Sequence, residues 1–125
     1  MKEKDYYIRY YRTRWTDCDN VVISLFFERG GDTQIGIVEI KIFHGKNEGK
    51  AYIWNLHVIN DFRGKGYGKA LLAEAKEFDK FWGCKEVSLE WDKRDTPQWV
   101  CDWYARNGFE VTEFGKGYAM MKKII

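Results

Sequence analysis

Along the first half of the chain, apolar and aromatic residues occur in short runs that are separated by glycine-containing turns. Residues 6–11 form an aromatic run, residues 21–28 are rich in β-branched and aromatic side chains, and apolar residues alternate through 33–43. The turns fall at 29–32 and 45–49, and a further run occupies 50–58. Alternation with a period of two and short connections are typical of antiparallel strands. This half therefore predicts an antiparallel meander of four strands.

The pattern changes to a helical period at Gly68. Apolar residues recur at 71, 72, 75, 78 and 82 among charged ones, and Gly83 is placed to end the helix. Residues 86–91 have the composition of another strand. A second helix is predicted from an N-cap at Asp95 or Thr96, with Pro97 in its first turn, to the pair at 107–108. Residues 109–114 and 117–125 are expected to form a final strand pair. We therefore expect an α+β fold: a mixed, mostly antiparallel central sheet, a strand–helix–strand core and two main helices.

Length and composition favour a single domain over residues 1–125. The chain is 45% hydrophobic and 18% aromatic, which supplies a core and argues against disorder. No apolar run approaches the roughly 18 residues of a membrane span. The charged first five residues lack the apolar region of a secretory signal. We expect a cytoplasmic protein that does not enter a membrane.

Cysteine, histidine and charge patterns exclude several kinds of site. The cysteines at 18, 84 and 101 are odd in number and have no CxxC spacing, so we expect reduced thiols. His44 and His57 belong to no metal-ligand pattern, so no metal site is expected. The net charge of +2 arises from 21 basic and 19 acidic residues that are interleaved, so binding of nucleic acid is not indicated.

The junction between the fourth strand and the first long helix carries the main chemical signal. Gly64, Gly66 and Gly68 occupy alternate positions and let the backbone approach a ligand closely. The helix start adds unpaired N–H groups, and basic residues at 63, 65 and 69 add charge, which together suit a pyrophosphate. The spacing is neither the GxGxxG of a dinucleotide fold nor a P-loop. On glycine content alone, a plain structural turn is the alternative.

Two motifs in sequence resemble a known family. Leu56-x-Val58, followed by Arg63-x-x-Gly66-x-Gly68 at the start of an Ala-Leu-Leu helix, resembles the coenzyme A motif of the GNAT superfamily of N-acyltransferases. Downstream, the strand at 89–91 and a helix that ends in Tyr104-x-x-x-Gly108-Phe109 resemble the second conserved block of that family. The resemblance extends from about Val21 to the C-terminus.

The resemblance implies the positions of the cosubstrate, acetyl-coenzyme A, and of a general acid. In the family, the strand at 56–58 diverges from the strand at 86–91 and the pantetheine arm lies in the gap. The implied coenzyme-binding residues are Leu56, His57, Val58, Arg63, Gly64, Lys65, Gly66, Tyr67, Gly68 and Lys69. Tyr104 matches the tyrosine that protonates the leaving thiolate, although a helix tyrosine of this kind can also be a core residue.

The chain departs from the family pattern in three places. Asn60 stands where a proline is usual, and Pro97 stands where an asparagine contacts the pantetheine arm. The segment at 12–20 is too short for the usual pair of N-terminal helices, so this helical region is shortened. These helices form one wall of the acceptor site, so that wall is expected to be open or to be supplied by the second subunit of a homodimer.

The resemblance implies direct transfer of an acetyl group from acetyl-coenzyme A to a primary amine, either of a small molecule or of a protein. Relatives place a glutamate that acts as the general base where this chain has Trp54. The base is therefore expected to be Glu39, Glu90, Asp92 or a water chain, and Glu90 is the candidate that we name. Tyr52 and Trp54 share one side of their strand and are expected to line the acceptor pocket, or else to be ordinary sheet packing. The alternative is a non-catalytic relative that binds coenzyme A or a protein partner.

Overall fold

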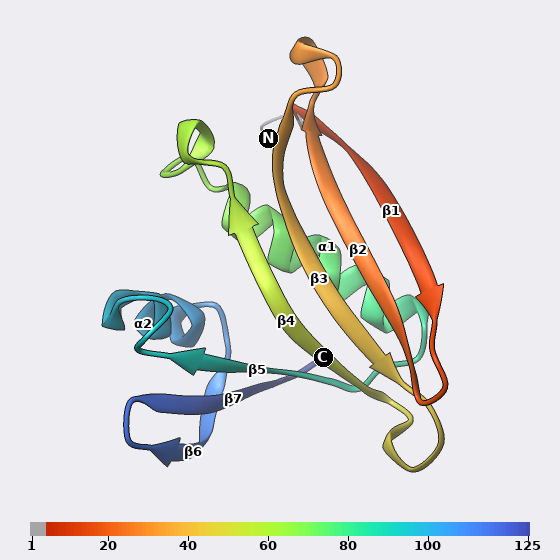
Figure 1. The fold of residues 1–125 in the computed structure, drawn as a ribbon, viewed down its shortest axis with the longest axis vertical. Helices are drawn as coiled ribbons and strands as arrows, with labels where there is room; N and C mark the ends of the chain where they lie inside the picture. Colours follow the sequence, from red (N-terminus) through yellow and green to blue (C-terminus); the bar gives the residue numbers. More distant parts are fainter. Residues whose placement is uncertain (1–4) are drawn as a thin grey trace.

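The computed structural model describes residues 5–125, so residues 1–4 of the charged start lie outside the described part of the chain. Within residues 5–125, one seven-stranded sheet and two α-helices form the fold, with short 3-10 turns between β2 and β3, between β3 and β4, and between β4 and α1 (Figure 1). In chain order the elements are β1 (Tyr6–Arg14), β2 (Cys18–Phe27), β3 (Gln34–Phe43), β4 (Lys50–Val58), α1 (Tyr67–Phe81), β5 (Glu86–Asp92), α2 (Gln98–Arg106), β6 (Glu110–Gly115) and β7 (Tyr118–Ile124).

The sheet has the strand order β1-β2-β3-β4-β5-β7-β6. Neighbouring strands are antiparallel except β4 and β5, which are parallel and joined through α1. A parallel pair needs such a crossover, whereas the hairpins need only short turns. The predicted α+β class, the four-stranded meander and the strand–helix–strand core are therefore confirmed.

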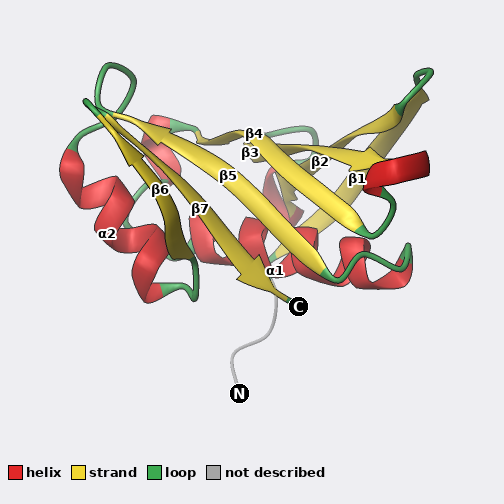
Figure 2. Ribbon diagram, turned by 90° about the horizontal axis from the view of Figure 1, so that it is seen from below, coloured by secondary structure: helices red, strands yellow, loops and turns green. Residues whose placement is uncertain are grey.

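Both α-helices pack on the same side of the sheet (Figure 2). The buried core lies between them and the strands, and Leu71 of α1 is completely buried at its centre, which contributes about 1.5–3 kcal/mol. Gly36 of β3 allows this close packing. A Cβ at that position would lie 2.5 Å from the carbonyl oxygen of His57 and 3.2 Å from Leu71 Cδ1. The opposite face of β1–β4 carries no α-helix within residues 5–125.

The segment at 12–20 is mostly strand, which corrects the predicted ends of the first two strands. β1 continues to Arg14 and β2 begins at Cys18, so only residues 15–17 connect them. Arg12 and His44 both bind the buried carboxylate of Asp19, His44 through Nε2 at 2.7 Å. Burial opposes ionisation, but the hydrogen bonds from His44 and Arg12 dominate and lower the pKa of Asp19. This ionic cluster holds the ends of three strands together. The connection of three residues, 15–17, is too short to form a pair of helices.

The helix boundaries differ slightly from those predicted. α1 ends at Phe81, and Gly83 adopts the left-handed conformation (φ 82°) expected of a residue that follows a helix. α2 begins at Gln98 with Pro97 as its N-cap, rather than with Asp95 or Thr96. The reason is local, because the amides of Asp95 and Thr96 both donate to the carbonyl oxygen of Asp92 and form a turn instead.

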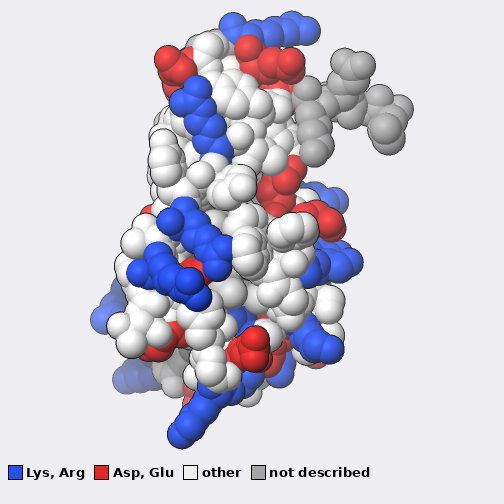
Figure 3. Space-filling model, turned by 90° about the vertical axis from the view of Figure 1, so that its right-hand side faces the viewer, with Lys and Arg blue, Asp and Glu red and all other residues white. Residues whose placement is uncertain are grey.

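The edge strand β1 lies along the outer side of α1. Tyr6 donates to Glu74, the ring of Tyr10 meets Phe78 edge-on, and Arg12 lies over the ring of Trp82. On the side of the molecule shown in Figure 3, acidic and basic side chains are interspersed with uncharged surface, as their interleaving in the sequence predicted. No helix within residues 5–125 is long and apolar enough to cross a membrane.

Candidate active site

The strands β4 and β5 separate near the middle of the sheet. Their parallel pairing runs from Lys50 and Glu86 to Ile53 and Leu89 and stops there, while β4 continues beside β3 to Val58. The two strands visibly diverge beyond this point (Figure 1). A β-bulge lies at the same place, because the register with β3 shifts between Glu39 and Ile40 and leaves Trp54 without a partner. The divergence implied by the family resemblance is present.

Backbone groups of β4 line this gap. The amide of Ile59 donates to Ile35 of β3 at 2.8 Å, so residue 59 faces β3. Backbone groups alternate in direction along an antiparallel strand, so Leu56 and Val58 face the gap and His57 faces β3. The Val58 carbonyl already accepts a hydrogen bond from Arg63 Nε at 2.8 Å. The N–H groups of Leu56 and Val58 and the carbonyl of Leu56 therefore remain for a ligand in the gap.

The loop that follows β4 presents backbone toward solvent. Gly64 and Gly66 have φ angles of 75° and 89°, and a Cβ on either would meet no atom within 4 Å. Such φ values favour glycine. Gly66 is the N-cap of α1, and its carbonyl accepts from Ala70 at 3.1 Å. The amides at 67–69 precede that bond, so they have no carbonyl within the helix to bind. This is the geometry of an anion site.

The side chains around this loop differ in what they can contribute. Arg63 and Lys65 are exposed at the loop. Tyr67 turns inward, where its hydroxyl donates to Asp5 at 2.6 Å and burial raises its pKa to about 12. It therefore offers a ligand only its backbone. Lys69 is exposed and also lines a pocket between α1 and the sheet, together with Ile53 and Val87.

Tyr104 lies on α2 beside the start of α1. Its ring makes edge-on contacts with Trp103 and Phe109 and packs against the core. Burial raises the pKa of Tyr104 to about 12, so its hydroxyl stays protonated at physiological pH. Trp103 approaches Gly68, where an added Cβ would lie 3.3 Å from the indole. Contact between α2 and the first turn of α1 thus fixes Tyr104 at the same end of the sheet as the loop.

Tyr52, Trp54 and Glu90 lie on the helix-free face at the point where the strands separate. Tyr52 pairs with Ser88, and Glu90 is two residues further along β5 on the same face. Burial, and then the charge of Glu90, raises the pKa of Tyr52. Trp54 is 45% exposed and donates from Nε1 to Asn20 Oδ1 at 2.9 Å, so it extends across β3. The structure brings Tyr52 and Glu90 together, whereas the indole of Trp54 points the other way, over β3.

The candidate bases have different environments. Asp92 is bound by Arg94, whose hydrogen bonds lower the pKa of Asp92 to about 2 and make it a poor base. Glu39 lies on the helix-free face and accepts from Asn55 Nδ2 at 2.9 Å. The exposed Glu90 is the candidate base whose charge acts on Tyr52. Glu39 and Glu90 therefore remain as bases, together with bound water.

Sequence reasoning missed Asp79, which is completely buried in α1. Its burial could have been predicted, because Asp79 follows Leu71 by eight residues and Ala75 by four, on the core side of the helix. The cysteines at 18, 84 and 101 are free and buried. Burial and the nearby Asp79 raise the pKa of Cys84 to about 11, which makes it a poor nucleophile.

Comparison with known proteins places this geometry in context. The model of the acetyltransferase (GNAT) family matches residues 2–109. Among solved structures, the PaiA N-acetyltransferase of Thermoplasma acidophilum in complex with coenzyme A is similar, with 27% identity and a TM-score of 0.70 over 83% of this chain. This chain spans only 60% of the length of that protein.

Two more distant structures share the fold. An acetyltransferase from Bacillus cereus has 20% identity and a TM-score of 0.70, with 86% of this chain and 74% of that chain covered. Nourseothricin acetyltransferase has 17% identity and a TM-score of 0.68, with 96% and 84% covered. Among curated proteins, none shows significant sequence similarity to this chain. The diverging strands, the glycine loop and the family match lead to one conclusion: the chain belongs to the GNAT family of acetyltransferases.

Proposed function

We propose that this protein transfers the acetyl group of acetyl-coenzyme A directly to a primary amine. The observation that carries the proposal is the end of β4–β5 pairing at Ile53 and Leu89, next to a glycine loop with free amides. In this proposal the amides at 64–69 and the start of α1 hold the pyrophosphate, with Arg63 and Lys65 beside it. The pantetheine arm binds the free backbone groups of Leu56 and Val58 in the gap.

The reaction requires an uncharged amine. An alkylamine has a pKa of about 10.4, so deprotonation at neutral pH costs roughly 4–5 kcal/mol. Glu90, directly or through water, accepts that proton at the edge of the gap, while Tyr52 and Trp54 hold the amine. The amine nitrogen then attacks the thioester carbonyl carbon. The C–S bond breaks, the nitrogen loses its remaining excess proton to water as the amide forms, and the coenzyme leaves as a thiolate that takes up a proton.

Tyr104 is proposed to stabilise that thiolate. With a pKa of about 12 it is a weaker acid than an alkyl thiol, whose pKa is about 8.5. Complete transfer of its proton is therefore uphill by about 5 kcal/mol. We expect the hydrogen bond that Tyr104 donates to the sulfur to be its main contribution, with the proton on the thiol ultimately supplied by solvent.

The open sheet face bears on the acceptor. Residues 15–17 leave no room for helices over Tyr52 and Trp54, so the groove suits an extended or macromolecular amine, or is closed by a second subunit. The proposal therefore includes a homodimer, which a sedimentation measurement of the mass in solution would test. Reduced cysteines are consistent with a cytoplasmic location.

The experiment is a screen of primary amines with acetyl-coenzyme A, read by release of thiol, with calorimetry of coenzyme binding in parallel. Binding with turnover of at least one amine is the expected result. The helix-free face and Pro97 favour a second candidate, a non-catalytic domain that binds coenzyme A. Binding without turnover of any small or peptide amine would select that candidate, and no binding at millimolar coenzyme would refute both.

A further inference from the structure

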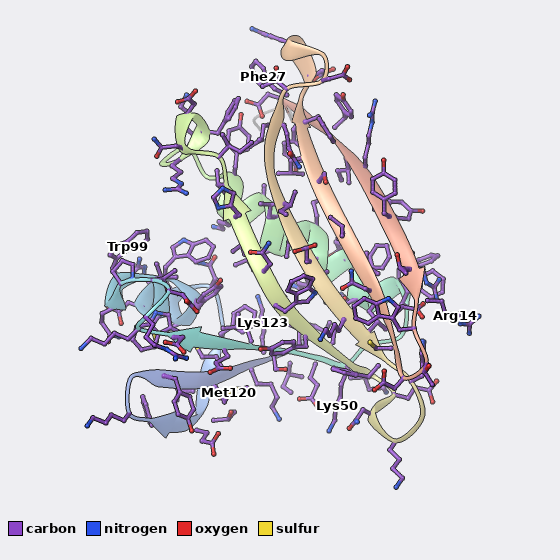
Figure 4. The ribbon with its side chains drawn as sticks, in the orientation of Figure 1. Arg14, Phe27, Lys50, Trp99, Met120 and Lys123 are labelled. Carbon is purple, nitrogen blue, oxygen red and sulfur yellow. The ribbon has the colours of Figure 1, made fainter. Side chains whose placement is uncertain are left out.

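The outer edge of β1 has no neighbouring strand within residues 5–125. β1 is the first strand in the sheet order, and Arg14 marks its end at the rim of the sheet (Figure 4). Residues 8–14 are all exposed, and Tyr10 and Tyr11 are 62% and 68% exposed. Proteins usually protect a long edge strand with lysine, proline or a bulge. β1 contains no lysine or proline, and its register with β2 is continuous over nine residues, so the edge is open to another strand.

Every second residue of β1 directs its backbone groups outward. The Asp5 carbonyl accepts from the Glu28 amide at 3.0 Å, so residue 5 faces β2. The Trp15 amide donates to the Cys18 carbonyl at 2.8 Å, so residue 15 also faces β2. Backbone groups alternate in direction along an antiparallel strand, so odd-numbered residues face β2 and even-numbered residues face away from the sheet. The outward residues are Tyr6, Ile8, Tyr10, Arg12 and Arg14.

Exposed apolar side chains gather beside this edge, on the helix side of the sheet. The ring of Tyr10 meets Phe78 of α1 edge-on, and Ile8, which is 38% exposed, shares that face of β1. At the end of α1, Phe81 is 82% exposed and Trp82 is 44% exposed. Such a patch next to an unpaired strand edge marks an interaction surface.

The strand is complementary to a second copy of itself in antiparallel orientation. Outward-facing residues pair with one another, so even-numbered residues must lie opposite even-numbered ones. The register centred on Tyr10 pairs all nine residues of β1. In this register Arg9 lies opposite Tyr11, Arg12 opposite Ile8, and Arg14 opposite Tyr6. Centring the pair on Arg9 would set two arginines opposite each other, which is unfavourable, and centring it on Tyr11 would leave residues 6 and 7 without partners.

We propose that β1 is a homodimer interface, in which β1 of one copy pairs antiparallel with β1 of a second copy about a two-fold axis at Tyr10. Five outward residues of each copy form five hydrogen-bonded pairs with two bonds each, or about ten backbone hydrogen bonds, which is typical of a stable interface. The two sheets become one, with the helices of both copies on the same side. Ile8 then lies beside Arg12 of the second copy, whose guanidinium covers Trp82.

The other edge of the sheet, β6, fits β1 less well. β6 is six residues long, and its register with β7 shifts between Val111 and Glu113, which bends the strand. Arg12 of β1 is already bound to Asp19, which weakens its attraction to an acidic strand. A contact between β1 and β6 would also leave a free edge at each end and continue into an open chain of copies.

This interface gives the homodimer of the proposed function a location, but its assembly does not depend on acetyl transfer. β4 lies three strands from β1, so the helix-free face beside Trp54 stays open in this dimer. Of the two arrangements of the groove, the interface therefore favours the extended or macromolecular amine. Assembly is measured without coenzyme, so failure of the acetyl-transfer proposal would not change its result.

The first test is sedimentation of the full chain at several concentrations, and we expect the mass of two chains. Ile8→Lys sets a lysine opposite Arg12 of the second copy, and the two-fold axis repeats this contact, so the dissociation constant should rise at least about tenfold. Val111→Lys is the matched control, because Val111 is 36% exposed on the edge strand β6, and it should leave the dimer intact. A monomer at every concentration, or dissociation by Val111→Lys and not by Ile8→Lys, would overturn the proposal.

The second test is oxidative cross-linking, which reports the register. The cysteines of the chain are buried, so an introduced surface thiol reacts alone. Tyr10→Cys places two thiols at the axis with Cα atoms about 5.5 Å apart, within the range of a disulfide, and should form a linked dimer. In Tyr11→Cys the two Cα atoms are roughly 8 Å apart, which is too far. Cross-linking of Tyr11→Cys alone, or growth of the unmodified chain beyond a dimer, would contradict this interface.

Discussion

Gly66 has two separate roles at the proposed coenzyme loop, one in the backbone conformation and one in the surface open to a ligand. Its left-handed backbone penalises any side chain, and its surroundings are open toward solvent. A substitution there therefore changes both the stability of the fold and the surface offered to a phosphate. Gly49 has nearly the same φ angle, 88°, and the same open surroundings, but it lies before β4 at the opposite end of that strand.

Gly66→Asp should abolish binding of coenzyme A, because it places a carboxylate beside the pyrophosphate. Gly49→Asp is the matched control, since it imposes the same backbone strain and the same charge away from the loop. We expect both variants to lose about 1–2 kcal/mol of stability, and only Gly66→Asp to lose binding in calorimetry. Normal binding by Gly66→Asp would remove the loop from the proposed site.

Tyr104→Phe keeps the ring contacts with Trp103 and Phe109 and removes only the hydroxyl. If that hydroxyl stabilises the leaving thiolate, turnover should fall about 10²–10³-fold while coenzyme affinity stays nearly constant. Tyr11→Phe, at an exposed tyrosine of β1, is the control for loss of a hydroxyl. An unchanged rate in Tyr104→Phe would leave Tyr104 as a packing residue of α2.

At the scale of elements, the central feature is that β4 changes neighbours along its length. Its first half pairs with β3 and β5, and its second half pairs with β3 alone. The bulge at Trp54 marks the transition and directs the indole over β3 to Asn20. In most sheets such an unpaired stretch is a liability, but here it provides backbone donors and acceptors for a ligand.

Trp54→Ala tests the acceptor wall that this geometry creates. We expect a higher KM for the best amine of the screen, with coenzyme binding unchanged, because the indole lies on the open face and not in the gap. Trp15→Ala is a close control, since Trp15 has the same exposure of 45% and lies in the β1–β2 hairpin. If both variants had the same KM as the unmodified chain, the acceptor would bind elsewhere.

At the scale of the whole molecule, Asp79 makes the stability of the fold depend on pH. Folding raises the pKa of Asp79 from near 4 to about 7, so the folded chain holds this proton more tightly than the unfolded chain. The free energy of unfolding should therefore decrease as pH rises from about 4 to 7, and this contribution should stay constant above that range. Three pKa units correspond to about 4 kcal/mol.

Asp79→Asn removes this titration, so the free energies of unfolding of the variant and of the unmodified chain should diverge as pH rises. The difference in free energy of unfolding is expected to grow in favour of the variant by about 4 kcal/mol between pH 4 and 7, as measured by urea denaturation. Asp32→Asn, at a side chain that is 92% exposed, should show no such growth. A constant difference for Asp79→Asn would mean that the carboxyl group finds a partner in solution.

Local patterns in the sequence were sufficient to predict the elements and their order. Alternation in the first half, the helical period after Gly68 and the turn glycines depend on neighbours close in sequence, so each strand and helix was predicted to within a few residues. The largest error concerned residues 12–20. Their strand pairing depends on Asp19 meeting Arg12 and His44, and His44 is 25 residues away.

The glycine loop and Tyr104 were readable from sequence because their spacing is local and matches a family pattern. Other features required distant segments to meet. The contact of Trp54 with Asn20, the position of Glu90 beside Tyr52 and the burial of Asp79 under the sheet all join separate elements. The sequence by itself determined the elements and the coenzyme motif, because these depend on local periodicity and backbone freedom. The acceptor face and the burial of Asp79 were decided only by tertiary structure, because register and burial arise when distant strands and helices pack.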